Sequence, residues 1–188
     1  MTLVSVIIPN YNHATFLRLR IDSVLNQTFQ DFEVIILDDC STDASREIIE
    51  DYRSHSRVVA VFYNEKNSGS TFLQWMKGME LASGRWIWIA ESDDIADRYI
   101  LQRVMEVTEA NENTGLVFVQ SHMINHEGQI LGSMISHTSI FKSPIWDSNF
   151  RMSGLEFIRR FMLIQNSIPN ASAVFFKRSY YYENCYPK

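Results

Sequence analysis

The chain has only two cysteines, Cys40 and Cys185, among its 188 residues. Two cysteines so far apart in sequence are too few for a disulfide framework or a zinc site. We therefore expect reduced thiols in a cytosolic protein. Basic residues are also fewer than acidic ones, 17 against 22, so the net charge is -5, and no run of Lys or Arg occurs. This balance argues against nucleic acid as the main partner.

Long apolar stretches and targeting signals are lacking as well. The first apolar run ends at Pro9 and Asn10, which is too short for a signal peptide. No stretch approaches the ~20 apolar residues that a membrane span requires. We expect a cytoplasmic location and no membrane span in this chain, so any membrane association would come from regions outside it. The oligomeric state is not predicted.

Two common phosphate-binding motifs are absent. Neither GxGxxG nor a Walker A sequence follows the first apolar run. A phosphate would therefore need another partner, and a metal ion held by carboxylates is the obvious substitute.

Four short runs rich in β-branched residues alternate with helical patterns in the first 115 residues. The runs are predicted strands at 3–8, 32–37, 58–63 and 86–89. Helices are predicted at about 14–26, from about 44 to 52, from about 72 to 83 and at about 97–110. Such alternation predicts a three-layer α/β/α fold with a mostly parallel central sheet and right-handed crossovers. Its polar strand-end loops then meet at one edge.

Residues after Gly115 follow a different pattern. A strand at 116–120 and a hairpin at 121–134 are predicted, and 136–150 has no periodicity. Long irregular loops are usually functional or disordered. A capping box at 153–156 predicts a helix to about 164, followed by a strand at 171–176 and a helix from about 179.

Two predicted strands end in carboxylates. Asp38 and Asp39 follow the second strand, and Glu91, Asp93 and Asp94 follow the fourth. Ligands bind beyond the carboxyl ends of strands in open α/β sheets, and a hard divalent cation prefers oxygen ligands. The alternative is a charged loop in which Asp94 or Asp97 caps the next helix.

Five segments together resemble the inverting family 2 glycosyltransferases of GT-A fold. These segments are VSVIIPNYN at 4–12, LDDCSTD at 37–43, NSG at 67–69, KGMELASGRWIWIAESDD at 77–94 and SAVFFKRS at 172–179. Each is weak alone, but their order and spacing are strongly specific.

The resemblance implies transfer of a sugar from a nucleotide-diphosphate donor, with uracil the usual base, to an acceptor hydroxyl with inversion. The acceptor would be a sugar, a lipid-linked sugar or a polysaccharide. Asp39 would read the base, Asp93 would face the ribose or a metal-bound water, and Asp94 would ligate Mg²⁺ or Mn²⁺. The remaining residues implied in donor binding are Pro9, Tyr11, Asn12, Gly69 and Lys77.

The chain departs from the family pattern at two places. Gln74-Trp75-Met76 stands where many relatives have Ala-Arg-Asn, so a cationic contact to the donor phosphates would come from Lys66 or Lys77. The family's catalytic base is expected beyond Lys188.

The resemblance also implies how the chain is organised. We expect a single GT-A domain over 1–188, with about 1–115 binding the nucleotide-sugar and about 116–188 on the acceptor side. Two alternative functions remain open: a catalytically incomplete nucleotide-sugar-binding module, or a sugar nucleotidyltransferase.

Overall fold

A computed structural model describes residues 3–168 and 170–184, so Cys185 and Lys188 lie outside it. Its described part forms two compact units, residues 3–117 with 174–184 and residues 118–173 apart from 169. We describe each unit by itself.

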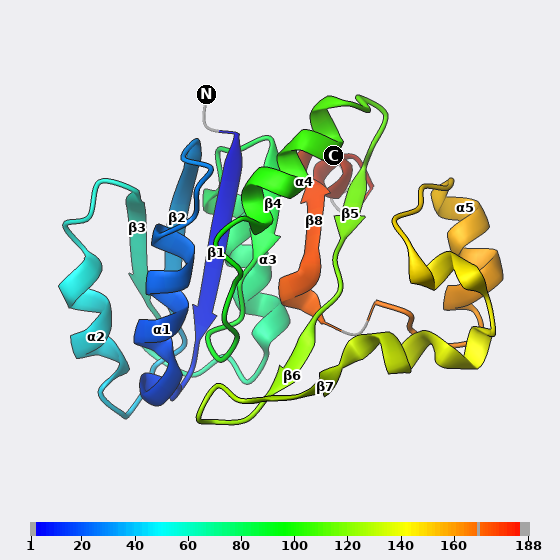
Figure 1. Cartoon of the computed structure of the whole chain (residues 1–188). Helices are drawn as coiled ribbons and strands as arrows, with labels where there is room; N and C mark the ends of the chain where they lie inside the picture. The colour runs from blue at the N-terminus through cyan, green and yellow to red at the C-terminus, as the bar shows by residue number, and fades with distance from the viewer. Residues whose placement is uncertain (1–2, 169, 185–188) are drawn as a thin grey trace. The chain divides into compact units, whose positions relative to one another are not determined.

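Unit 1 is built on a mostly parallel six-stranded sheet in the order β3-β2-β1-β4-β8-β5. Its strands are β1 (Val4–Asn10), β2 (Phe32–Asp38), β3 (Val58–Tyr63), β4 (Trp86–Ile89), β8 (Val174–Lys177) and β5 (Leu116–Phe118), the last of which ends at the first residue of unit 2. Strands β1 to β4 run parallel to one another, and β8 pairs antiparallel with β4. After β3 the order of strands reverses and β4 lies on the other side of β1 (Figure 1). Such a reversal marks the ligand crevice in open α/β sheets.

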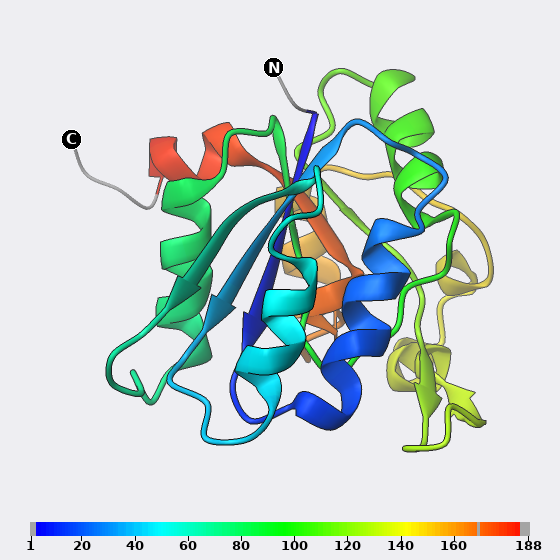
Figure 2. The same cartoon turned by 90° about the vertical axis from the view of Figure 1, so that its left-hand side faces the viewer.

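Helices cover both faces of this sheet. They are α1 (Ala14–Leu25), α2 (Ser45–Tyr52), α3 (Thr71–Leu81), α4 (Ile100–Glu109) and α6 (Arg178–Asn184). Helices α1, α2 and α4 lie on one face, whereas α3 and α6 lie on the other (Figures 1 and 2). The predicted three-layer α/β/α architecture is confirmed for unit 1.

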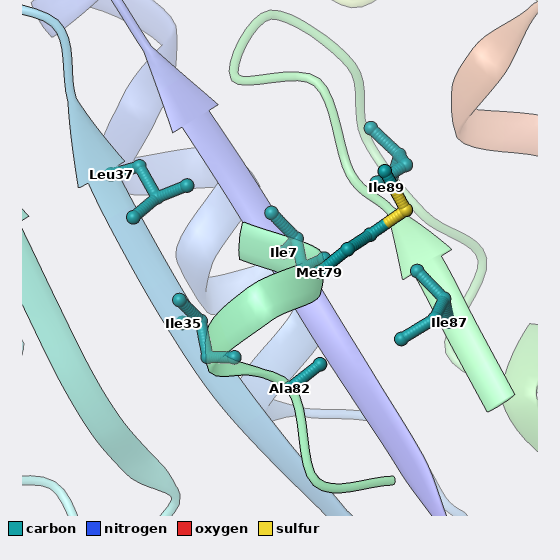
Figure 3. Packing of buried hydrophobic residues seen from close by; sticks show 7 residues of the cluster. All are labelled: Ile7, Ile35, Leu37, Met79, Ala82, Ile87 and Ile89. Atoms are coloured by element: carbon teal, nitrogen blue, oxygen red, sulfur yellow. The ribbon is translucent and has the colours of Figure 1, made fainter. Parts of the chain in front are cut away.

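The core beneath α3 contains side chains from three parallel strands. Ile7, Ile35, Leu37, Ile87 and Ile89 pack against Met79 and Ala82 (Figure 3). Every residue of β1, β2 and β4 is buried, as expected for strands covered on both faces.

The apolar spacing of Phe72, Trp75, Met76 and Met79 predicts the buried face of α3, and this prediction is only partly correct. Phe72 and Met76 are exposed, at 64% and 38%, and the helix instead buries Gln74, Gly78 and Met79. A Cβ on Gly78 would lie 2.3 Å from Cγ2 of Ile7, so this glycine allows the closest contact between helix and sheet. The spacing of Leu101, Val104, Met105 and Thr108 likewise predicts the buried face of α4, and all four residues are buried.

Unit 2 consists of short elements. Its hairpin pairs β6 (His122–Ile124) with β7 (Ile130–Ser133), and Gly128 in the turn has φ 79°. The segment predicted to lack regular structure instead contains two 3₁₀-helices, η1 (Met134–Phe141) and η2 (Pro144–Asp147). Helix α5 (Gly154–Phe157) continues as a π-helical turn, η3 (Ile158–Met162), and η4 (Ala171–Ala173) ends the unit.

Aromatic side chains form the centre of unit 2. Trp146, which is 7% exposed, lies within 6.5 Å, centroid to centroid, of five phenylalanine rings: Phe118, Phe141, Phe150, Phe157 and Phe161. Trp146 therefore has a structural role in the core of this unit.

No helix among the described residues is both long and apolar enough to span a bilayer.

Candidate functional site

The carboxyl ends of β1, β2 and β4 form the candidate site in unit 1. Asn10 pairs with Asp38 in the last register position of β1 and β2, and the Ala90 N–H donates to the Ile7 carbonyl at 2.7 Å just after β4. The strand ends therefore meet at the point where the strand order reverses, which is the expected position for a ligand.

A polar network joins the loop after β1 to the loop after β2. The Asn10 amide donates to Asp38 Oδ1 at 2.8 Å, and the Ser41 hydroxyl donates to the same oxygen at 2.5 Å. The Asn12 N–H in turn donates to Ser41 Oγ at 2.9 Å. Asp38 is buried and bound on all these sides, so its role is to fix the two loops to each other.

Tyr11 and Asn12 lie in the first of these loops. Asn12 has the left-handed conformation, φ 55°, and its Oδ1 accepts from the Thr42 N–H at 2.8 Å. The ring of Tyr11 is 46% exposed, so a flat ligand can reach it. Pro9 is buried in β1, two residues before Tyr11.

Asp39 lies at the centre of a second network and is only 4% exposed. Its Oδ1 accepts from the amides of Asn64 at 2.6 Å and Gln74 at 2.9 Å, and from the Ser68 N–H at 2.9 Å. Its Oδ2 accepts from the Ser68 hydroxyl at 2.7 Å. A carboxylate oxygen has two lone pairs, so Oδ2 retains capacity for one further donor.

The acidic loop, defined as Glu91–Asp94, follows β4. The Trp75 indole N–H donates to Glu91 Oε1 at 2.7 Å, and His13 Nδ1 lies 2.7 Å from Ser92 Oγ. Asp93 is exposed and Asp94 is half-buried. The two anchored residues are thus followed directly by one exposed and one half-buried aspartate.

A buried arginine compensates the charge of this loop. Arg20 of α1 is 1% exposed, and its guanidinium carbon lies 5.1 Å from the centre of the Trp88 ring. Burial lowers the pKa of Arg20 to about 10, whereas the negative charges of Asp94, Glu91 and Asp93 raise it. Arg20 therefore remains cationic at neutral pH.

Burial also acts on Glu91. It raises the pKa of this carboxyl, as do the nearby charges of Asp93 and Asp94, whereas the Trp75 hydrogen bond and Arg20 lower it. The charge of Glu91 is thus costly to hold in the folded protein.

Asp93 and Asp94 fit a cation shared with a ligand. The described residues contain no group of three or more His, Cys, Asp or Glu side chains arranged to hold a metal by themselves. Mg²⁺ is usually bound through one or two carboxylates plus phosphate and water oxygens. Asp93 and Asp94, one exposed and one half-buried at the edge of the sheet, could supply the two carboxylates of that donor set.

Gly69 and Lys77 lie apart from the acidic loop. Gly69 has φ 71° in the turn after β3, and its N–H donates to Asn67 Oδ1 at 2.8 Å. Lys77 Nζ lies 4.8 Å from the centre of the Phe62 ring in β3, the edge strand on the far side of β2 and β1 from β4.

Four contributors to the site were not predicted from sequence: His13, Arg20, Gln74 and Trp75. Only Arg20 has a local signal, because it falls at i+3 from Leu17 and i−4 from Val24 on the apolar face of α1. The others act through contacts with residues far away in sequence.

The chain is similar to known glycosyltransferases. It is 33% identical over 131 residues to the uncharacterized glycosyltransferase MJ1057 of Methanocaldococcus jannaschii, covering 69% of this chain and 45% of that protein. It is 34% identical over 104 residues to the glycosyltransferase GlyG of Streptococcus pneumoniae, covering 55% of this chain and 34% of GlyG. The chain thus spans less than half the length of these curated relatives.

Solved structures support the fold. The S. aureus TarS structure in complex with UDP has a TM-score of 0.74 at 21% identity, with 98% of this chain and 49% of that chain covered. The mannosyltransferase PcManGT from Pyrobaculum calidifontis, in complex with GDP-Man and Mn²⁺, has a TM-score of 0.55 at 21% identity, covering 65% of this chain and 35% of that chain.

These likenesses agree on the GT-A fold. The family model described as glycosyl transferase family 2 matches residues 5–167. The chain belongs to glycosyl transferase family 2.

Proposed function

We propose that the chain carries the donor site of a metal-dependent, inverting glycosyltransferase that uses a UDP-sugar. One observation carries this proposal: a buried, hydrogen-bonded carboxylate, Asp39, and the two aspartates Asp93 and Asp94 lie at the carboxyl edge of one parallel sheet, where its strand order reverses. The UDP and UDP-GlcNAc complexes of the structurally similar TarS support the choice of nucleotide.

Asp39 and Tyr11 would bind the base. The remaining acceptor capacity of Asp39 Oδ2 suits the imide N–H of uracil, and the exposed Tyr11 ring offers a surface for stacking. The hydrogen bonds to Oδ1 hold the carboxylate in place before the ligand arrives.

Asp93 and Asp94 would hold Mg²⁺ or Mn²⁺ on the donor diphosphate. When bound, such a cation stabilises the negative charge that develops on the leaving diphosphate. Asp94 is the better ligand candidate, since its half-buried carboxylate is less hydrated than that of Asp93. The Mn²⁺ complex of PcManGT supports the cofactor.

Inversion requires a base beside the acceptor hydroxyl. We assign none of the described residues to that role, so donor binding is the part of the reaction that they support. A nucleotide-sugar-binding module is therefore the second candidate function, favoured by the small share of the relatives' length that the chain covers. The acceptor, whether sugar, lipid-linked sugar or polysaccharide, and the cytoplasmic location stay predictions.

A thermal-shift panel tests the donor site. UDP, GDP, dTDP, CDP and ADP are each added with Mn²⁺ and with EDTA. A ligand at ~100 times its Kd stabilises by about 2.7 kcal/mol, which is several degrees in Tm for a domain of this size. We expect UDP with Mn²⁺ to raise Tm, and Asp94→Ala to abolish the metal-dependent part.

The control variant is Asp51→Ala, which removes an exposed carboxylate paired with Arg18 at 2.5 Å. Exposed pairs of this kind contribute little to stability. If no nucleotide raises Tm in either condition, or if Asp94→Ala responds like Asp51→Ala, the proposed donor site is wrong.

A further inference from the structure

Two consecutive residues of the acidic loop are each held by a residue of a different helix or its N-cap. Glu91 is held by Trp75 of α3, and Ser92, which is 2% exposed, is held by His13 at the start of α1. Helices α1 and α3 lie on opposite faces of the sheet (Figure 2). The loop is therefore clamped between both helical layers as it leaves β4.

The two anchors also determine where the aspartates point. The Asp94 N–H donates to the Glu91 carbonyl at 3.3 Å, which closes a turn over residues 91–94. With the side chains of Glu91 and Ser92 directed inward, this turn leaves Asp93 exposed and Asp94 half-buried.

Trp75 is itself rigidly placed. The Phe72 ring packs edge-on against it at 5.0 Å between centroids and an angle of 75°. Gly78, one turn further along α3, brings the helix against Ile7 of β1. The indole N–H thus approaches Glu91 from a helix that cannot easily shift.

Gln74, the residue before Trp75, contacts the acidic end of β2 in the same way. Gln74 is buried, and its amide donates to Asp39 Oδ1 at 2.9 Å. Successive helical residues point about 100° apart, so one turn of α3 reaches the end of β2 with Gln74 and the end of β4 with Trp75.

We propose that Trp75 and His13 are positioning residues, which hold the acidic loop in its cation-binding arrangement before the donor arrives. This inference rests on the proposed function, since it assigns the loop to the cation and diphosphate. Carboxylates this close repel one another, so without the two hydrogen bonds the acidic side chains would move apart. Ordering the loop again when the donor binds would then weaken binding. The hydrogen bond from the Trp75 indole N–H to Glu91 and the hydrogen bond between His13 and Ser92 supply that order in advance.

The test compares nucleotide binding with and without metal. Trp75→Phe keeps a packed ring but removes the N–H donor, and His13→Ala removes the partner of Ser92. Each variant should weaken UDP binding in Mn²⁺ by about 3- to 10-fold, which corresponds to the loss of one hydrogen bond of about 0.7–1.4 kcal/mol. Binding in EDTA should be unchanged, because Asp39 and Tyr11 remain intact.

Trp86→Phe is the matched control. Trp86 is also buried, but it lies at the opposite end of β4 from the acidic loop. A purely structural loss should lower Tm and weaken binding equally in Mn²⁺ and EDTA. His13→Asn, which retains a polar atom near the Nδ1 position, should restore part of the affinity lost in His13→Ala.

Amide hydrogen exchange measures the anchoring without any ligand. Residues 91–95 should exchange faster in Trp75→Phe and His13→Ala than in the wild type, and at the wild-type rate in Trp86→Phe. Unchanged exchange together with unchanged Mn²⁺ dependence would overturn the inference while leaving the proposed function intact. A wild type that binds no nucleotide even with Mn²⁺ would overturn the proposed function and this inference with it.

Discussion

Asp39 and Glu91 are both carboxylates at strand ends, but they lie in opposite surroundings. Asp39 accepts four hydrogen bonds, three of them at one oxygen. Glu91 accepts a hydrogen bond from the Trp75 indole N–H and lies near the negative charges of Asp93 and Asp94. Asp39 is thus held in position to accept a further hydrogen bond, whereas the charge of Glu91 is electrostatically unfavourable in the folded protein.

That cost predicts a pH-dependent effect of Glu91→Gln. Burial raises the pKa of Glu91 in the folded protein, and Asp93 and Asp94 add to the rise, although Trp75 and Arg20 oppose it. A carboxyl whose pKa is higher in the folded than in the unfolded protein stabilises the fold at pH values below its unfolded pKa. This stabilisation is lost as the pH rises through the folded pKa. Glutamine stays neutral and can still accept from Trp75, so the variant should be the more stable protein at neutral pH in metal-free buffer.

Tm measured in EDTA from pH 4 to pH 8 checks this expectation. The advantage of Glu91→Gln over the wild type should grow with pH and then level off above the folded pKa. An advantage that is constant across this range would show that ionisation of Glu91 does not limit stability.

Helix α3 shows at the scale of one element why a hydrophobic pattern can mislead. Its large apolar side chains at 72 and 76 suggest a buried face, but the helix turns a glutamine and a glycine toward the sheet. Close approach at Gly78 and the hydrogen bond from Gln74 to Asp39 fix that orientation. These contacts of Gln74 and Gly78 thus override the local apolar period.

Gly78→Ala should therefore destabilise the protein. The added Cβ would meet Cγ2 of Ile7 at 2.3 Å, and this β-branched side chain is fully buried and cannot move aside. Overpacking of this kind costs about 1–3 kcal/mol. The variant should also weaken nucleotide binding, because α3 carries Gln74 and Trp75.

Gly154→Ala is the matched control, since a Cβ at the first residue of α5 has no neighbour within 4 Å. Chemical denaturation of both variants gives the free energies of unfolding. Equal stability of Gly78→Ala and Gly154→Ala would contradict the close-packing account of α3.

At the scale of the whole molecule, the two units differ in how they are stabilised. Unit 1 has long, fully buried parallel strands, whereas unit 2 has strands of three and four residues and an aromatic centre around Trp146. Short elements with exposed hydrogen bonds open locally at lower free energy.

Hydrogen exchange should therefore be slowest in β1, β2 and β4 and faster throughout 118–168. Trp146→Ala should accelerate exchange across unit 2 because it removes the ring around which the phenylalanines pack. It should leave β1 and β2 unchanged. Equal acceleration in both units would show that they unfold as one.

The sequence by itself determined the architecture of unit 1 and the location of its acidic ends. Strand and helix periods are local properties, and parallel strands carry their carboxyl ends to one edge by geometry alone. The family could likewise be recognised from short segments such as LDDCSTD and IAESDD, because they are contiguous.

The side chains that hold those acids in place depend instead on tertiary contacts. The pairs Trp75–Glu91, His13–Ser92 and Gln74–Asp39 lie 16, 79 and 35 residues apart in sequence. No local pattern specifies such contacts, since they depend on how closely α3 and α1 pack against the sheet. The 3₁₀-helices of unit 2 escaped prediction for a related reason, because contacts among aromatic rings rather than a periodic apolar face stabilise them.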